Sequence, residues 1–202
     1  MKSDMHRVCA VLVLALGLPG VAAAATIWDE SVDGNLSTDP NAPTPIVFAA
    51  GNNVISGSVG GPGNVGDYIT FTFAPDQGLT GLLLLEFASQ MGDSRGFNGI
   101  NEGPTSFIPS PVTQDNFLGG NHVNAFEAGT DILPRLATTP LVGAGFTIPL
   151  GAGTYSYLIQ QTGADLTSYS LEFQVVPVPA AVWLFGSALG LLGWFRRADR
   201  LA

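Results

Sequence analysis

The central part of this 202-residue chain is predicted to form an all-β fold, an antiparallel β-sandwich or jelly roll. Three observations predict it. Short runs alternate between apolar and polar residues with a period of two, as half-buried strands do. Turn-forming residues separate these runs, and the chain contains 26 glycines and 14 prolines. Charged residues make up only 11% of the chain, and no segment has a persuasive amphipathic helical pattern, which disfavours a helical bundle.

The strand pattern differs in strength along the chain. The strong candidates are the segments 67–73, 79–89, 154–162 and 168–176, and the weaker ones are 46–49, 54–59, 121–126 and 146–150. In 67–73, Ile69, Phe71 and Phe73 share one face. The run 79–89 is more continuously apolar, which is typical of a strand covered on both sides. The stretch 90–130 has no clear period, and we expect long loops there over one end of the sandwich.

Residues 1–25 have the three parts of a secretory signal peptide. Lys2 and Arg7 provide the positive start, an apolar run covers positions 8–18, and alanines at 22–25 form a small-residue cleavage site. As a helix, the apolar run covers only about 16 Å, which is too short to span a bilayer comfortably. We expect export by the Sec machinery and cleavage after Ala24 or Ala25.

The part of the chain that would be exported is strongly acidic. Positions 26–176 contain 14 aspartates and glutamates against two arginines, Arg95 and Arg135, which gives a net charge of −12. Such a surface repels nucleic acid and anionic lipid headgroups, so nucleic-acid binding is excluded. The only cysteine, Cys9, lies in the predicted signal peptide. We therefore expect no disulfide in the exported part, and stability that comes from burial.

The segment 179–195 predicts a single membrane-spanning helix. Its 17 residues contain no charged side chain and would cover about 25 Å as a helix. Trp183 and Trp194 lie near its ends, where indole rings favour the interface. Positively charged residues follow the span at Arg196, Arg197 and Arg200. Because positive residues stay on the cytoplasmic side, the exported part should lie outside and the C-terminus inside.

A Pro-x-Pro element precedes this span, formed by Val176, Pro177, Val178, Pro179 and Ala180. The two prolines hold the element extended and exclude a regular helix there. With the following AVWLFGSALGLLGWFRR, it resembles the PEP-CTERM sorting signal in its VPxPA variant, which would occupy residues 175–200. It departs from the commonest form in having Val178 where a glutamate is usual.

The resemblance implies recognition by an exosortase, a membrane-embedded cysteine transpeptidase of Gram-negative bacteria that make exopolysaccharide. It also implies transient anchoring in the inner membrane, followed by transfer of the exported domain, residues 26–174, to the cell surface or matrix. Within that domain, the spacing of strand, APDQG turn and strand is similar to exported PEP-CTERM sandwiches and to bacterial pre-peptidase C-terminal-like domains.

One motif is typical of hydrolases. Gly92-Asp93-Ser94-Arg95-Gly96 matches G-x-S-x-G, and Asp115 and His122 follow in the order of a Ser–Asp–His triad. A nucleophile elbow requires a helix after the motif, whereas FNGINEGPTSFIP follows and is not helical. We interpret the motif as a polar loop flanked by glycines, and we predict no catalytic residue.

Acid-based hydrolysis remains an alternative that the sequence does not resolve. The acids Asp93 and Glu102, or Asp115 and Glu127, form pairs of the kind that glycosidases use. The separation of the two carboxyl groups decides such a role, and a sequence does not contain it. With 14 acids in the exported part, pairs also arise by chance.

A calcium site is the one metal site that the residue types allow. Asp29, Glu30 and Asp33 surround a predicted turn, but they do not have the spacing of an EF-hand. We interpret them as solvated loop acids. With one histidine and no cysteine in the exported part, a zinc, copper or iron site is excluded. We expect no metal and no cofactor.

The favoured function is that of a non-enzymatic surface or matrix protein, associated with exopolysaccharide or biofilm. A carbohydrate-binding module for exopolysaccharide, with its site in the stretch 90–130, is the first alternative, and an acid-based hydrolase is the second. The phenylalanines of that stretch could line a sugar site, although core packing is the favoured role. They are Phe97, Phe107, Phe117 and Phe126.

Overall fold

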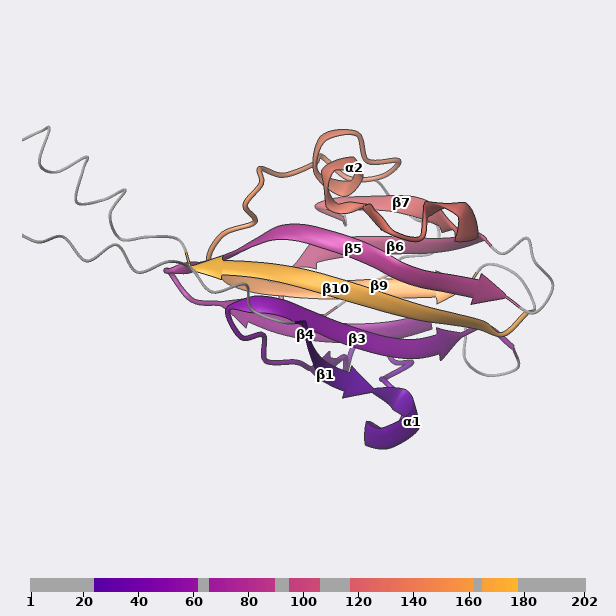
Figure 1. Ribbon diagram of the computed structural model, residues 1–202. Helices are drawn as coiled ribbons and strands as arrows, with labels where there is room; N and C mark the ends of the chain where they lie inside the picture. The colour runs from indigo at the N-terminus through magenta and orange to yellow at the C-terminus, as the bar shows by residue number, and fades with distance from the viewer. Residues whose placement is uncertain (1–23, 62–65, 90–94, 106–116, 162–164, 178–202) are drawn as a thin grey trace, which may run out of the picture.

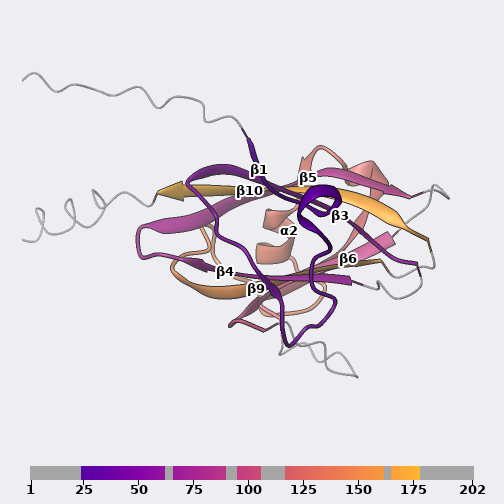
Figure 2. The same ribbon diagram turned by 90° about the horizontal axis from the view of Figure 1, so that it is seen from below.

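The computed structural model describes residues 24–61, 66–89, 95–105, 117–161 and 165–177, which form two layered β-sheets (Figures 1 and 2). Sheet A contains, in spatial order, β1 (Ala25–Asp29), β3 (Gly51–Val59), β10 (Thr167–Pro177), β5 (Gln77–Ser89) and β8 (Thr130–Asp131). Sheet B contains β2 (Thr44–Pro45), β4 (Gly66–Phe73), β9 (Gly153–Gln161), β6 (Arg95–Glu102) and β7 (Gly119–Asn124). The helical elements are α1 (Glu30–Asp33), η2 (Ala125–Glu127) and α2 (Leu133–Thr138).

The prediction of an all-β sandwich is confirmed, but the sheets are not purely antiparallel. At one edge of sheet A, β1 pairs parallel to β3, and at one edge of sheet B, β2 pairs parallel to β4. A parallel pair needs a long connection between its strands. Residues 30–50 provide one between β1 and β3, and they add β2 to the opposite sheet on the way.

Alternating residues of both sheets form one hydrophobic core. The buried side chains include Ile69, Phe71 and Phe73 on β4, and Tyr169, Leu171, Phe173 and Val175 on β10. Since successive strand residues point to opposite faces, the period of two directs all of them toward the other sheet. The predicted strands 67–73 and 168–176 are therefore confirmed, together with the face that each buries.

The prediction for β5 is partly wrong, because the strand is not covered on both sides. Leu84 is fully buried, but Leu85 is 40% exposed. Leu84 pairs with Leu171 and Glu86 with Ser170, so Leu85 is the extra residue of a β-bulge in the pairing with β10. A bulge interrupts the alternation of faces, which explains why an apolar run continues onto an exposed position.

The stretch 90–130 was expected to form loops, and this prediction is wrong for much of it. Strands β6 and β7 lie there and pair antiparallel, with Arg95 opposite Asn124. Buried positions of β6 are occupied by Gly96 and Asn98, which conceal the period of two. Glycine is required at position 96, because a Cβ there would lie 2.6 Å from the Phe87 ring.

The weaker strand candidates have mixed outcomes. Segments 54–59 and 121–126 coincide largely with β3 and β7, whereas 46–49 and 146–150 are not strands. Ile46, Phe48 and Leu150 are nevertheless buried in the core. The apolar character of these segments indicates burial and not strand formation, because a segment can be buried without pairing to a neighbouring strand along its length.

The short helix α2 closes one edge of the sandwich between the two layers (Figure 2). It buries Leu133 and Leu136 in the core. In β7, a Cβ at Gly119 would lie 1.9 Å from the carbonyl oxygen of Leu136, so glycine is what allows the helix to approach the strand. The sequence did not predict α2, because six residues are too few to show a helical period.

The sandwich has two distinct ends. At the first, which we call the tail end, β4 turns into β5 and Pro177 of β10 pairs with Gln77. At the opposite end, the distal end, Ser89 pairs with Thr167 and Gly96 with Gln161. The eleven residues of β10 connect the two ends and span about 33 Å.

Candidate functional site

The predicted sorting motif begins inside the folded domain. Val176 pairs with Gly78 and Pro177 with Gln77, so both motif residues are extended and belong to β10. The other predicted sorting and topology residues lie outside the described residues, as does the predicted span 179–195; they are Val178, Pro179, Ala180, Arg196, Arg197 and Arg200. Within the described ranges, no helix is long and apolar enough to cross a membrane.

The three acids of the calcium candidate accept hydrogen bonds from the protein itself. Asp29 Oδ1 accepts from the hydroxyl and the amide of Ser31 at 2.6 and 2.9 Å, and these bonds lower the pKa of Asp29. Asp33 accepts from the amide of Asp29 at 2.9 Å. Glu30 accepts from the amides of Leu36 and Ser58, each at 2.8 Å. Among the described residues, no three metal-ligating side chains come together.

The hydrolase-like motif is described only in part. Its residues Gly92, Asp93 and Ser94 lie outside the described ranges, as does Asp115. His122 lies on β7 with its Nδ1 3.3 Å from the carbonyl oxygen of Gly96. This contact with the backbone orients the imidazole ring. Because a carbonyl oxygen only accepts hydrogen bonds, Nδ1 is the donor.

The phenylalanines of the stretch 90–130 have different environments. Phe117 is buried with Tyr68 and Leu158 on the outer side of sheet B, and Phe97 packs against this cluster. Phe126 is 85% exposed. The core-packing interpretation therefore holds for Phe117 and is wrong for Phe126, while Phe107 lies outside the described residues.

A pocket of about 340 Å³ lies at the distal end, along the edge of sheet B. It is lined by Arg95 of β6, His122 and Asn124 of β7, and Phe126 of η2. Because Arg95 pairs with Asn124, the first residue of β6 lies beside the lining residues of β7 and η2. The pocket thus combines a guanidinium, an imidazole, an amide and an exposed aromatic ring, and no carboxylate is among these lining side chains.

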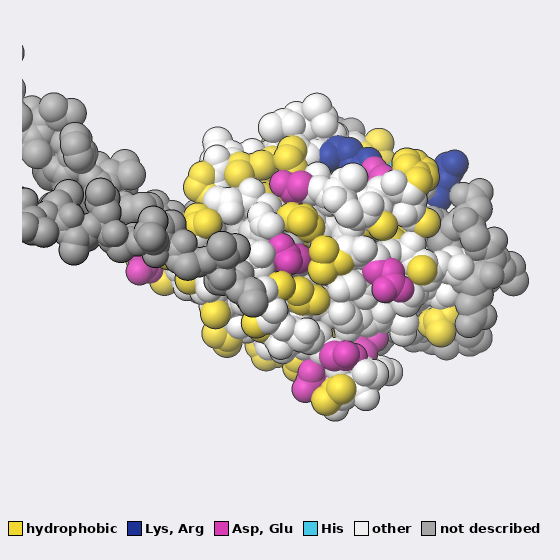
Figure 3. Space-filling model, viewed as in Figure 1, with side chains coloured by type: hydrophobic (Ala, Val, Ile, Leu, Met, Phe, Trp, Pro, Cys, Tyr) yellow, Lys and Arg dark blue, Asp and Glu magenta, His cyan; other side chains and the backbone are white. Residues whose placement is uncertain are grey.

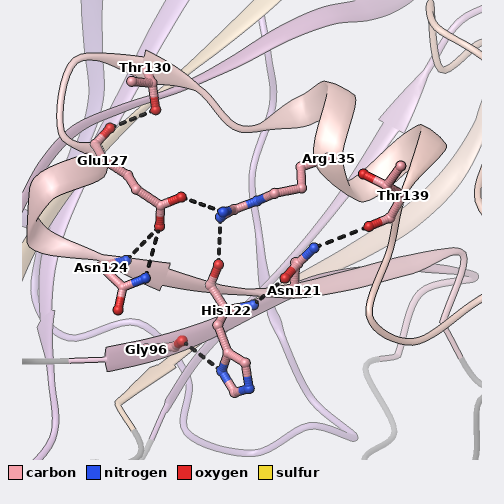
Figure 4. Close-up of polar contacts among 8 residues, drawn as sticks. All are labelled: Gly96, Asn121, His122, Asn124, Glu127, Thr130, Arg135 and Thr139. Carbon is pink, nitrogen blue, oxygen red and sulfur yellow. Dashed lines mark hydrogen bonds and ion pairs between the residues drawn. The ribbon is translucent and has the colours of Figure 1, made fainter.

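A hydrogen-bond network connects two of the lining residues, His122 and Asn124, to η2 and α2 (Figure 4). Arg135 of α2 forms an ion pair with Glu127 and donates to the carbonyl oxygen of His122 at 2.5 Å. Glu127 Oε2 accepts from the backbone amide of Asn124 at 2.8 Å and from its side-chain Nδ2 at 3.2 Å. Glu127 is therefore committed to positioning Arg135 and Asn124. The alternative that Glu127 and Asp115 form an acid pair is untested, because Asp115 is outside the described residues.

Positive charge in the described domain is confined to this region. Arg95 and Arg135 are its only arginines, it contains no lysine, and His122 is its only histidine. Figure 3 shows the dark blue side chains toward the α2 and β7 side of the molecule, while the acids are spread over the face of sheet A. Sequence analysis missed Asn124 and Arg135 as site residues. The signal available was that the three potential cations of the predicted exported part, Arg95, His122 and Arg135, all lie between positions 95 and 135.

A second hollow, of about 480 Å³, lies on the outer face of sheet A. Serines and acids dominate its lining, which includes Ser56, Ser58, Glu86 and Ser168. Glu86 accepts from the hydroxyl of Ser168 at 2.8 Å. The two hollows therefore have opposite electrostatic character, and the one at the distal end alone combines an arginine with an exposed ring.

Comparisons with known proteins add little to this geometry. No protein-family model matches the chain, and no curated protein matches it at a significant level. A solved structure, the pre-peptidase C-terminal domain of a collagenase from Bacillus anthracis, is similar with 13% identity and a TM-score of 0.33. The similarity covers 69% of this chain and 99% of that one. We draw no functional conclusion from a likeness of this extent.

Proposed function

We propose that this chain is an exported, non-enzymatic protein of the cell surface or extracellular matrix, sorted through its C-terminal segment by an exosortase-like enzyme. The observation that carries the proposal is the order of three features after the sandwich. A Pro-x-Pro element at 176–180 is followed by an uncharged apolar segment and then by three arginines in five positions. Each feature alone is common, but their order matches the requirements of a sorted membrane anchor.

The fold supports this function in one respect. The motif begins within β10, because the last two residues of the strand, Val176 and Pro177, are its first two residues and are already extended. A protease or transpeptidase cleft binds an extended backbone most readily, because the amides and carbonyls of such a segment can pair with the enzyme when they are not paired within a sheet. The tail end of the sandwich would then face the membrane during processing, and the distal end would face outward.

Substitution of the prolines tests the processing role. The full-length chain would be produced in a host that contains the exosortase, and the exported domain and the tail would be followed by blotting in membrane and external fractions. The Pro177→Ala, Pro179→Ala protein should accumulate at full length in the membrane, because alanines allow the predicted helix to extend through the motif. The native chain should lose its tail.

Because Pro177 is also the last residue of β10, the single Pro179→Ala variant is a matched comparison that leaves the sandwich unchanged. It should retain most of the processing defect. Replacing Arg196, Arg197 and Arg200 should instead disturb the orientation in the membrane. Equal release of the native and the double-alanine proteins would contradict the processing role and leave a simple C-terminal anchor.

Sequencing the N-terminus of the exported protein tests its export. The mature chain should begin at Ala25 or Thr26, just at the start of β1. Recovery of Met1 on exported material would show that residues 1–25 are not a cleaved signal peptide.

A further inference from the structure

A small cavity lies inside the hydrophobic core, between the two sheets. Its volume is about 10 Å³, which is room for one water molecule and too little for a larger ligand. Every residue that lines it is buried, and all are apolar except Asp67 of β4, Tyr157 of β9 and Tyr169 of β10. Cavities lined only by apolar side chains stay dry, so these three residues decide what the cavity can hold.

The alternation of faces along the strands brings the three polar side chains to the cavity. Asp67 lies on the face of β4 that Ile69 also buries. Asp67 pairs with Ile159, so Tyr157, two residues earlier on β9, is its diagonal neighbour on the inner face of sheet B. Tyr169 comes from the opposite sheet, and its hydroxyl donates to Asp67 Oδ2 at 2.8 Å. One acid and two phenols from both sheets therefore converge here.

Tyr157 carries a hydroxyl that no protein group of the described chain binds. Its side chain is 2% exposed, and its oxygen has no hydrogen-bond partner among the described residues. A hydroxyl that loses its bonds to bulk water on folding and gains no other destabilises the folded state. Native proteins satisfy such groups with ordered internal water where the cavity allows it. Because Tyr157 lines a cavity of the size of one water molecule, its partner has room there.

The donors and acceptors around the cavity match those of one water molecule. The Tyr157 hydroxyl can donate to the water oxygen. A carboxylate can accept several hydrogen bonds, so Asp67 can accept from the water as well as from Tyr169. Since the Tyr169 hydroxyl directs its proton to Asp67, its oxygen can accept the second proton of the water. These are three partners, which is the usual number for an internal water molecule.

We propose that this cavity is a binding site for one internal water molecule, which joins the Tyr157 hydroxyl to the hydrogen-bonded pair of Asp67 and Tyr169. The water connects the two layers of the sandwich, because Tyr157 and Asp67 belong to sheet B and Tyr169 belongs to sheet A. A fully satisfied polar network in a core requires one geometry, so the water helps to fix how the sheets are aligned. The inference does not depend on the sorting function proposed above.

A high-resolution crystal structure of the full-length chain, prepared in detergent, tests the site directly. It should show one ordered water molecule about 2.6–3.0 Å from the Tyr157 hydroxyl oxygen and from the Asp67 carboxylate. Thermal unfolding of the Tyr157→Phe protein tests the bond. Its melting temperature should fall by about 2–5 °C, because the water loses one partner. If the hydroxyl had no partner at all, its removal would leave the melting temperature unchanged or raise it.

Two further variants separate the water from an ordinary loss of a hydroxyl. Tyr155 also lies on β9 but does not line the cavity, and its hydroxyl donates to the carbonyl oxygen of Gly151 at 3.2 Å. The crystal structure of Tyr155→Phe should therefore keep the water. In the double variant Tyr157→Phe, Tyr169→Phe, the fall in melting temperature should be smaller than the sum of the two single falls, because both hydroxyls bind the same water.

Three results would each overturn the inference. The first is a native crystal structure without ordered water in the cavity, and the second is a direct hydrogen bond from the Tyr157 hydroxyl to a protein group. The third is a Tyr157→Phe protein that melts at the native temperature or above it. Should Tyr157→Phe fail to fold, the electron density beside Tyr157 in the native protein still decides whether the water is bound.

Discussion

The tail end and the distal end of the sandwich have different kinds of interior. Near the tail end, aromatic rings fill the space between the sheets: Phe48 lies 4.7 Å from Phe173 and 5.1 Å from Phe71, measured between ring centroids. Toward the distal end, polar pairs cross between the strands. Tyr169 donates to Asp67 at 2.8 Å, and Gln161 donates to Thr167 at 2.7 Å.

This difference indicates a division of roles along the domain. Tightly packed aromatic residues bury large areas and stabilise the end at which the chain enters and leaves the sandwich. Polar pairs contribute less net stability, but each requires one geometry and so specifies a precise arrangement. The end that holds the pocket is thus positioned by hydrogen bonds, and the end that continues into the tail is held by burial.

Truncating one phenylalanine at each end gives the largest expected contrast. Phe173 is fully buried, so Phe173→Ala should reduce the free energy of unfolding by about 3–5 kcal/mol. Phe126 is 85% exposed, so the same chemical change there should alter it by less than about 0.5 kcal/mol. Chemical unfolding of the released protein, followed by circular dichroism, measures both. Comparable losses would show that the Phe126 side chain is packed in the folded protein as the Phe173 side chain is.

Alkaline pH should destabilise the polar interior. Burial raises the pKa of Tyr157, and burial together with the nearby Asp67 charge raises the pKa of Tyr169. Folding therefore keeps both phenols protonated. The contribution of the two protonated phenols to the free energy of unfolding is complete below about pH 10, the pKa of tyrosine in the unfolded chain. It is lost as the pH rises from there through the raised pKa of the folded state. At pH 11 the two together should lower the free energy of unfolding by about 2–3 kcal/mol.

Denaturant unfolding at pH 8 and pH 11 measures this loss. Tyr169→Phe should reduce the pH dependence without abolishing it, because Tyr157 remains and burial also raises the pKa values of Tyr68 and Tyr155. Equal pH dependence in the native and Tyr169→Phe proteins would show that Tyr169 does not ionise on unfolding in this range.

The ion pair between Arg135 and Glu127 should have a smaller effect. Arg135 is 35% exposed and Glu127 is 14% exposed, so solvent weakens their attraction only in part. Arg135→Met should lower the free energy of unfolding by about 1 kcal/mol. Glu127→Gln should have little further effect in that background, because both changes remove the same interaction. If the losses in the free energy of unfolding from the two substitutions added fully, the ion pair would not couple η2 to α2.

Chelation of calcium should have the smallest effect of all. The carboxylates of Asp29, Glu30 and Asp33 already accept hydrogen bonds from backbone amides. Addition of EDTA should therefore leave the melting temperature of the protein unchanged. A metal held at about 100 times its Kd would contribute about 2.7 kcal/mol, and a loss of that size would show that these acids bind calcium.

Local spacing predicted the strands well where the buried residues are apolar. Phe71 and Phe173 belong to strands in which every second residue is apolar and buried, so the sequence of each strand indicates which face is buried. The same reasoning missed β6, since Gly96 and Asn98 occupy its buried positions. Glycine is present there because the Phe87 ring leaves no room for a side chain, and Phe87 comes from another sheet.

The candidate site was harder to predict than the fold. The sequence indicated the region 90–130 as a place for ligand sites because long loops were expected there. The structure instead has the paired strands β6 and β7 in this region. Phe126 was grouped with Phe97 and Phe117, because a sequence does not separate exposed from buried rings. Asn124 and Arg135 had no motif to mark them, since their roles arise from contacts with Glu127.

By itself, the sequence determined the β class of the exported part, its acidic charge, and the apolar, arginine-flanked character of the C-terminal segment. These properties follow from composition and from the spacing of near neighbours. Only the tertiary structure decided that Arg95 meets Asn124 and that Arg135 reaches His122 from a helix. The register of β6 against β7 and the approach of α2 to Gly119 bring these residues together, and both depend on packing between distant segments.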